Sequence, residues 1–336
     1  MTENGLQLRT RDPADPLVVS GVEVPAGSRT RVDLPSGNLS SGTPVSLPIE
    51  IVRGRRPGPH VWLSSGIHGD ELNGIEVIRR VLGSLRPAQV GGAVFAAPIV
   101  NVYGFISRSR YLPDRRDLNR SFPGSPRGSL ASRLAHLFMT EIVDHCDVGM
   151  DLHTGSDHRT NLPQLRADLD DPATRTLARA FAPPVMVHSA TRDGSLRAAA
   201  AGLSIPILVF EGGEPNRFDS EAIEVAVAGV LRVLGELGVA GSPARSAPPE
   251  PMEVRHTRWV RAGRAGILRL SAQPGQKVRK GEQLGFIADS FGARPLSVRS
   301  PMEAVVLGVT RNPIVNRGDA VANLGRVERG EKTPSP

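Results

Sequence analysis

Short apolar runs mark a series of buried strands in the middle of the chain. Each run is bounded by polar, Gly or Pro residues, and its length suits a strand better than a helix. The predicted strands are residues 60–65, 93–100, 147–152, 184–189 and 206–210.

Helical periodicity fills the stretches between these runs. Apolar residues recur at spacings of three and four over 72–85 and over 130–142, and a further helix is predicted over 220–237. Asp171 followed by Pro172 predicts another helix start, because Asp caps helices and Pro is favoured at the first helical position. Strands that alternate with helices predict an α/β sheet with helices on both faces.

The two ends of the chain have a different pattern. Residues 1–45 contain short β-branched pieces among Gly, Pro and Ser, which predicts a β extension before an α/β domain over 46–240. Pro, Ala and Ser dominate residues 241–252, which we interpret as a linker. We expect residues 329–336 to form a disordered tail.

An internal repeat organises residues 253–328. The segments "VRKGEQL", from Val278, and "VNRGDAV", from Val315, share one pattern 37 residues apart, and each follows a short β run. Two similar all-β halves predict a small pseudo-twofold β-sandwich.

Composition narrows the class of protein. The 336 residues suffice for about two domains, and 39% hydrophobic residues can build a core. No apolar run approaches the ~18 residues that span a bilayer, and the first residues lack a signal-peptide core. The single cysteine, Cys146, excludes an internal disulfide and fits a reducing compartment. We therefore expect a cytoplasmic protein without membrane attachment.

The formal charge of +7 comes almost entirely from scattered arginines. They form no run of five or more and are not interleaved with aromatic residues, so we expect no nucleic-acid binding. The fork of N–H donors on a guanidinium group matches a carboxylate in geometry. The excess of arginine therefore favours binding of an anionic small molecule.

Residues suited to chemistry follow three of the predicted strands. His68 and Glu71 come after the first, His153 after 147–152, and Glu211 after 206–210. Ligands bind beyond the carboxyl ends of strands in such sheets. Each of these residues alone has an ordinary explanation, such as a polar turn. Together, two His and one Glu form the ligand set of a catalytic zinc with an open position.

Two acids complete this prediction. Asp151 lies two residues before His153, on the same side of the strand, and is expected to hold the imidazole in one tautomer. Glu211 follows five mostly apolar residues, so its burial needs a functional reason. We expect Cys146 and the remaining histidines to be structural or at the surface.

Four segments resemble one known family. "GIHGDELNGIE", "RDLNRSFPG", "MDLHTG" and "VFEGGE" occur in the order seen in the succinylglutamate desuccinylase/aspartoacylase family of zinc amidohydrolases, which is related to the zinc carboxypeptidases. The resemblance covers about residues 15–240. It implies a zinc carboxypeptidase-like fold with a mixed, mostly parallel sheet. The chain is most similar to the bacterial branch that has a C-terminal β module and includes N-acetyl-diaminobutyrate-type deacetylases.

The resemblance also implies roles for individual residues. It places one zinc ion on His68, Glu71 and His153, and makes Glu211 the general base. Asn119 and Arg120 match the pair that binds a substrate carboxylate. Arg110 is assigned to the oxyanion, although Arg108, Arg115 and Arg116 occur in the same stretch.

Two assignments stay open. Glu214 is either a contact for a substrate amine or a surface acid of its loop. Residues 253–328 resemble biotinyl/lipoyl-like domains, but the hairpin "ADSFGARPLSVRSPMEA" contains no lysine to carry a cofactor. This module is therefore a lid or a subunit contact, and we favour the contact, which predicts a homo-oligomer.

The predicted function is removal of a small acyl group from an N-acyl amino acid or a related N-acyl amine. The alternatives are a zinc carboxypeptidase that acts on short peptides and a non-catalytic protein that binds a metabolite.

Overall fold

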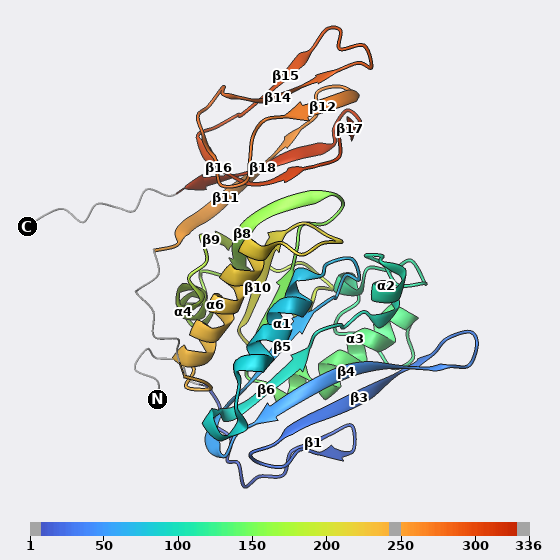
Figure 1. Cartoon of the computed structure of the whole chain (residues 1–336), viewed down its shortest axis with the longest axis vertical. Coiled ribbons are helices and arrows are strands. Elements are labelled where there is room, and N and C mark those ends of the chain that lie inside the picture. Colours follow the sequence, from blue (N-terminus) through green and yellow to red (C-terminus); the bar gives the residue numbers. More distant parts are fainter. Residues whose placement is uncertain (1–7, 242–249, 328–336) are drawn as a thin grey trace, which may run out of the picture.

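A single large β-sheet extends through the molecule (Figure 1). The computed structural model describes residues 8–241 and 250–327. The sheet has twelve strands in the order β13-β16-β18-β11-β9-β8-β10-β7-β5-β6-β4-β3. Its strands are β3 (Arg29–Asn38), β4 (Pro44–Arg53), β5 (Arg56–Ser65), β6 (Gly91–Ala97), β7 (Val148–His153), β8 (Arg159–Ala167), β9 (Val185–His188), β10 (Ile207–Gly213), β11 (Met252–Arg261), β13 (Lys277–Val278), β16 (Ala304–Thr310) and β18 (Ala320–Val327).

The centre of the sheet is parallel. Strands β6, β5, β7 and β10 pair in parallel, whereas β3, β4 and β8 join antiparallel neighbours. The expected α/β class and mixed sheet are confirmed. Each strand predicted from an apolar run is present, but the predictions missed β8. Its sequence, RTNLPQLRA, has no regular alternation of apolar and polar residues, and polar side chains of this strand reach the candidate site described below.

Helices cover both faces of this sheet. The alternation along β5 turns Val61 and Leu63 into one core and Trp62 into the other. Residues of α1, α4 and α6 fill the first core, and residues of α2, α3 and α5 fill the second. These helices are α1 (Asn73–Ser84), α2 (Val102–Ser107), α3 (Leu130–Glu141), α4 (Pro172–Phe181), α5 (Leu196–Gly202) and α6 (Ser220–Glu236).

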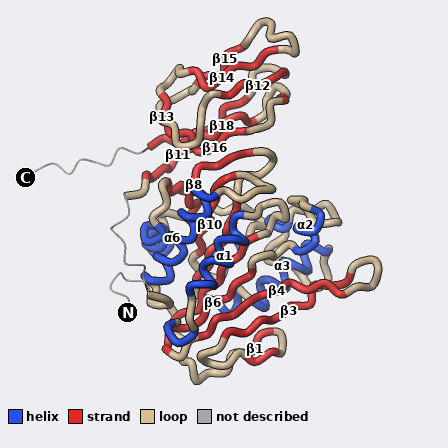
Figure 2. Tube along the Cα trace, viewed as in Figure 1, coloured by secondary structure: helices blue, strands red, loops and turns tan. Residues whose placement is uncertain are grey.

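The C-terminal module is built from strands throughout residues 250–327, as Figure 2 shows. A second sheet, in the order β15-β14-β12-β17, packs on its part of the large sheet around a separate apolar core. The strands of this second sheet are β12 (Gly266–Leu270), β14 (Gln283–Ala288), β15 (Leu296–Arg299) and β17 (Ile314–Val315).

The large sheet runs without a break into this module. The first residues of β11, Met252 to Val254, pair in parallel with β9, and the rest of β11 pairs with β18. A second connection joins β16 to β8. Most of the predicted linker (242–249) and all of the predicted tail (329–336) lie outside the described residues.

The N-terminal β extension does not end where the sequence predicted. The predicted boundary at residue 45 falls inside β4, where Ile49 and Ile51 belong to the core of the main domain. A ribbon of β1 (Val18–Val19) and β2 (Val22–Glu23) precedes the hairpin formed by β3 and β4.

Among the helices of the described residues, none combines the length and apolarity needed to cross a bilayer.

Candidate active site

The three strand ends that carry the predicted ligands meet at one edge of the sheet. Strands β5, β7 and β10 are parallel neighbours, so their carboxyl ends lie together. His153 ends β7 and is the register partner of Glu211 in β10. His68 and Glu71 lie in the loop between β5 and α1.

Local packing fixes this loop. A side chain at Gly69 would collide with the backbone of α2, because its Cβ would lie 1.9 Å from the Gly104 carbonyl carbon. Glycine is therefore required where the loop crosses the helix. At the other end of the loop, Asn73 donates to the Gly212 carbonyl oxygen and accepts from the Asp219 amide. The loop is thus tied to both α2 and the end of β10.

Glu71 lies between the two imidazoles. Its Oε1 is 2.8 Å from His68 Nδ1, and its Oε2 is 2.8 Å from His153 Nδ1. All three side chains are buried, and their ligand atoms lie within 4.8 Å of one another. The structure therefore brings together the three residues that the sequence analysis selected.

Carboxylates hold the outer nitrogens of both rings. His153 Nε2 is 2.6 Å from Asp151 Oδ2, and Ser64 donates to the other oxygen of Asp151. His68 Nε2 is 3.2 Å from Asp117 Oδ1. A proton on each Nε2 leaves the Nδ1 lone pair directed at the space beside Glu71, as a metal ligand requires.

The ionisation of each side chain in this cluster depends on the charges of the others. Burial opposes ionisation of Glu71, yet the charges of His68 and His153 hold its pKa well below the usual range. Burial also opposes protonation of His153, but Asp151 and Glu71 raise its pKa well above the usual value. The cluster therefore favours protonated imidazoles around an ionised Glu71, and a divalent cation bound there would replace ring protons.

The donor set fits zinc. Two imidazole nitrogens and one carboxylate, with an open side, are typical of catalytic rather than structural zinc. The buried Asp151 and the partly buried Asp117 provide the outer hydrogen bonds that such ligands need.

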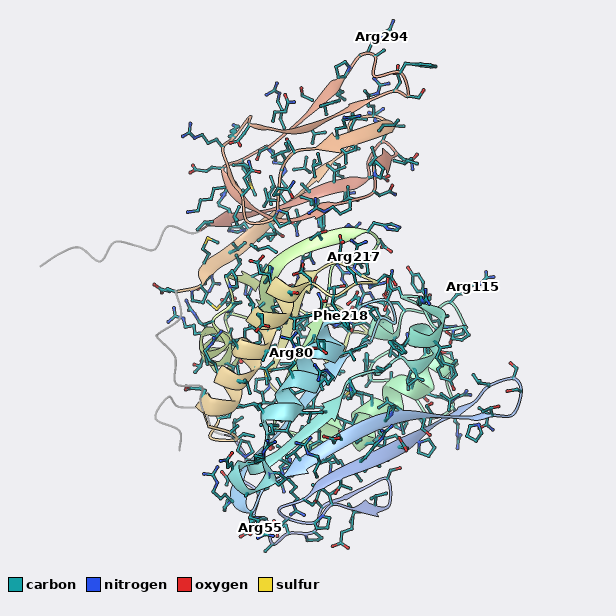
Figure 3. The ribbon with its side chains drawn as sticks, viewed as in Figure 1. Arg55, Arg80, Arg115, Arg217, Phe218 and Arg294 are labelled. Carbon is teal, nitrogen blue, oxygen red and sulfur yellow. The ribbon has the colours of Figure 1, made fainter. Side chains whose placement is uncertain are left out.

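Arg110 lies beside this cluster. Its Nη2 donates to Asp117 Oδ2 at 2.9 Å, and its Nη1 is 3.4 Å from Glu71 Oε1. The side chains of Arg108, Arg115 and Arg116 are exposed, and Figure 3 shows Arg115 at the periphery of the molecule. Among these four arginines, only Arg110 therefore contacts the ligand cluster.

A pocket of about 630 Å³ adjoins the cluster. Asp151 and Glu211 line it, as do the predicted substrate residues Asn119 and Arg120. Its other arginines are Arg166, Arg192 and Arg197. Burial and the neighbouring Arg166 lower the pKa of Arg197, as expected where guanidinium groups crowd together. The four arginines of the lining outnumber its three acids, Asp151, Asp193 and Glu211, so the pocket suits an anionic ligand.

Glu214 has two protein partners. Thr160 donates to its Oε2 at 2.7 Å, and Arg217 Nε is 2.9 Å from its Oε1. Figure 3 shows Arg217 below the C-terminal module. Glu214 does not line the pocket that contains Glu211, so the structure brings it near the site without joining it to the other predicted residues.

The sequence analysis missed several residues of this site. Asp117 stands within the quoted "RDLNR" segment, and the need for an acid on the second nitrogen of His68 would have pointed to it. Asn161 donates to Glu211 Oε2 at 2.6 Å, and Arg166 Nε lies 3.3 Å from Glu211 Oε1. Both belong to β8, which carried no sequence signal.

Comparisons with known proteins agree with this picture. Residues 57–237, more than half of the chain, match the family described as "Succinylglutamate desuccinylase/Aspartoacylase catalytic domain". The N-alpha-acetyl-L-2,4-diaminobutyric acid deacetylase of Halomonas elongata is 27% identical over 305 residues, covering 87% of this chain and 89% of that protein.

Two solved structures extend the similarity. A succinylglutamate desuccinylase/aspartoacylase from Rhodobacter sphaeroides has a TM-score of 0.80 at 31% identity, covering 89% of this chain and 96% of that one. The product-bound ectoine utilization protein EutE from Ruegeria pomeroyi has a TM-score of 0.81 at 22% identity, covering 94% and 99%. The second likeness shows the fold alone. From the family match and the relatives together, the chain belongs to the succinylglutamate desuccinylase/aspartoacylase family.

Proposed function

We propose that this protein is a zinc-dependent amidohydrolase that removes a small acyl group from an N-acyl amino acid or a related N-acyl amine. One observation carries the proposal: His68, Glu71 and His153 converge beside a pocket that also contains Glu211. The printed names of the relatives, a deacetylase and a desuccinylase, support the same class of reaction.

One zinc ion would be held by His68, Glu71 and His153. When bound, zinc supplies a Lewis acid that polarises an amide carbonyl and lowers the pKa of water to about 7. Asp151 and Asp117 hold the imidazole protons at Nε2, which keeps the rings oriented. These carboxylates belong to the proposed site as much as the ligands do.

Glu211 is the proposed general base. Its carboxylate accepts the proton of the attacking water and delivers it to the leaving amine, which must depart as a neutral amine. The position beside His153 in the neighbouring strand and in the wall of the pocket supports this role.

The arginines and Asn119 complete the proposal. Arg110 stabilises the oxyanion, a contribution often worth about 3 kcal/mol. Arg120 and Asn119 bind the substrate carboxylate in the arginine-rich pocket. Asn119 is itself oriented, because its Oδ1 accepts from the Leu196 amide at the start of α5. Glu214 would meet a substrate amine only if it exchanged one of its present partners.

The C-terminal module favours small substrates over peptides. Arg311 of this module donates to Thr160 in β8, next to Asn161, which donates to Glu211. A module this close to the proposed base would narrow the approach, whereas a peptide-trimming enzyme needs an open groove. This contact is the reason to prefer a deacylase over a carboxypeptidase.

The test is a panel of N-acyl amino acids and short peptides, assayed for released amine with the zinc-loaded protein. We expect turnover of the small N-acyl compounds and about one zinc per chain. Glu211→Gln should retain zinc while losing about 10²–10⁴ in rate. A protein that binds no zinc, or a Glu211→Gln variant with normal turnover, would contradict the proposal.

A further inference from the structure

Two side chains of β8 fix the orientation of the Glu211 carboxylate. The side-chain amide of Asn161 donates to Glu211 Oε2 at 2.6 Å, and Arg166 Nε lies 3.3 Å from Oε1. The register between β10 and β8 shifts between Glu211 and Gly213, and Gly213 pairs with Asn161. Such irregularities re-aim side chains next to active sites. The orientation of Glu211 therefore depends on where β8 places Asn161.

The C-terminal module touches β8 at this residue. Strand β16 pairs antiparallel with residues 159–161, and Gly308 lies opposite Asn161. A Cβ at position 308 would lie 2.4 Å from Asn161 Oδ1 and 3.1 Å from the Thr160 carbonyl oxygen. The module can approach Asn161 this closely only because residue 308 has no side chain.

Three further contacts secure the same stretch of β8. The Arg311 amide donates to the His158 carbonyl oxygen at 2.7 Å, and Arg311 Nε donates to Thr160 Oγ1 at 3.0 Å. Gln164 Nε2 donates to the Leu307 carbonyl oxygen at 3.1 Å. The hydroxyl of Thr160 in turn donates a hydrogen bond to Glu214 Oε2. Glu211 and Glu214, the two acids at the end of β10, are thus both linked to the C-terminal module through residues of β8.

We infer that Asn161 is a positioning residue for Glu211, and that the C-terminal module holds Asn161 in place through Gly308 and Arg311. The inference rests on the proposed role of Glu211 as general base. It gives the module a function within the reaction, since a base works only within hydrogen-bond reach of the proton it accepts. The side-chain amide of Asn161 is neutral, so it orients the carboxylate without adding to the charge of Arg166 beside the other oxygen.

The inference is tested by Asn161→Ala and Gly308→Ala in the full-length, zinc-loaded protein. We expect kcat to fall by about 10–100-fold, since a small misplacement of a catalytic group has effects of this size, while KM changes by less than about 3-fold. Zinc content and thermal midpoint should stay close to wild type. Arg311→Ala, which removes only a side chain, is the second variant of this contact should Gly308→Ala not fold.

The matched control is Gly263→Ala in the same module. Its Cβ would meet only the end of the Leu296 side chain, at 3.0 Å, which can rotate away. We expect kcat of this variant to equal wild type. Hydrogen exchange of the peptide covering residues 158–164 gives a readout without activity, and it should become faster in Gly308→Ala than in Gly263→Ala.

A double-mutant cycle identifies the route of the effect. Adding Asn161→Ala to Glu211→Gln should cost no further activity if Asn161 acts through Glu211. Normal kcat in Asn161→Ala, or an additive loss in the double variant, would overturn the inference. Normal kcat in both Gly308→Ala and Arg311→Ala would overturn the part assigned to the module. Full activity of Glu211→Gln would instead remove the proposed function on which the inference depends.

Discussion

At the scale of single residues, the candidate site contains carboxylates that hydrogen-bond to the proposed metal ligands and are not ligands themselves. Asp151 illustrates the point, because it accepts from Ser64 and His153 and is almost completely buried. Its charge favours the Nε2–H tautomer of His153, which leaves Nδ1 free for a metal ion. An acid in this position affects metal affinity without being a ligand.

Asp151→Asn should weaken zinc binding by about 10–100-fold, the usual effect of removing such an outer hydrogen-bond acceptor. Competition with a chromophoric chelator measures this affinity directly. Asp193→Asn is the control, since Asp193 lines the same pocket but is exposed. Equal zinc affinities of the two variants would exclude this role for Asp151.

A second residue-scale prediction concerns His60, which contacts His145 and Phe95. Burial, helped by the charge of Arg11, lowers the pKa of His60 from 6.5 to about 3. The unfolded chain therefore binds a proton between these values that the folded chain does not. The free energy of unfolding should fall with decreasing pH in this window, at about 1.4 kcal/mol per pH unit from this residue.

His60→Gln should remove that slope. Gln cannot titrate, and it retains a donor for the His145 carbonyl oxygen that His60 Nδ1 approaches at 3.0 Å. Urea unfolding at several pH values between 4 and 6.5, compared with wild type in the same buffers, gives the two slopes. Parallel curves would show that His60 does not contribute.

At the scale of elements, helix caps are the clearest link between sequence and structure. The Asp171–Pro172 pair predicted a helix start, and α4 begins at Pro172 with Asp171 Oδ2 accepting from the Thr174 amide at 2.7 Å. The helix packs Leu177 and Phe181 into the core shared with α1 and α6. The cap therefore stabilises a helix that covers one face of the sheet.

Asp171→Ala should lower the free energy of unfolding by about 1 kcal/mol, because an amide at the helix start loses its acceptor. Asp33→Ala on the exposed face of β3 is the control and should change it by less than about 0.5 kcal/mol. Urea unfolding at neutral pH measures both. A loss no larger than that of the control would show that the cap is dispensable.

At the scale of the whole molecule, the two modules share one sheet. Removing the C-terminal module would leave β9 without β11 and would uncover the apolar contacts among Val187, Val254 and Leu307. Deletion is therefore a poor test of how chains assemble. Substitutions on the outer surface of the module leave this shared sheet intact.

The predicted homo-oligomer is best tested on that surface. Ile267 and Ile314 are register partners in β12 and β17, and both are exposed, at 41% and 71%. If the module forms the subunit contact, Ile267→Glu combined with Ile314→Glu should reduce the mass measured by light scattering to that of one chain. An oligomer that persists in the double variant would place the contact elsewhere, and a monomeric wild type would end the prediction.

The sequence by itself determined the elements and the chemistry that is local to them. Apolar runs and helical spacing located the strands and helices, since burial imposes the period of each element. It also singled out His68, Glu71, His153 and Asp151, which the structure brings together, because ligands of such sheets bind beyond the carboxyl ends of strands. Both kinds of prediction use neighbours along the chain or a rule of sheet topology.

Only the tertiary structure decided what depends on contacts between distant segments. Strand β8 has no regular alternation of apolar and polar residues, so the sequence did not predict it. Its residues Asn161 and Arg166 meet Glu211 only through strand pairing. The approach of Gly308 to Asn161 joins residues far apart in the sequence. Which donor a carboxylate receives, and which module supports it, follows from the packing of the complete chain rather than from any single segment.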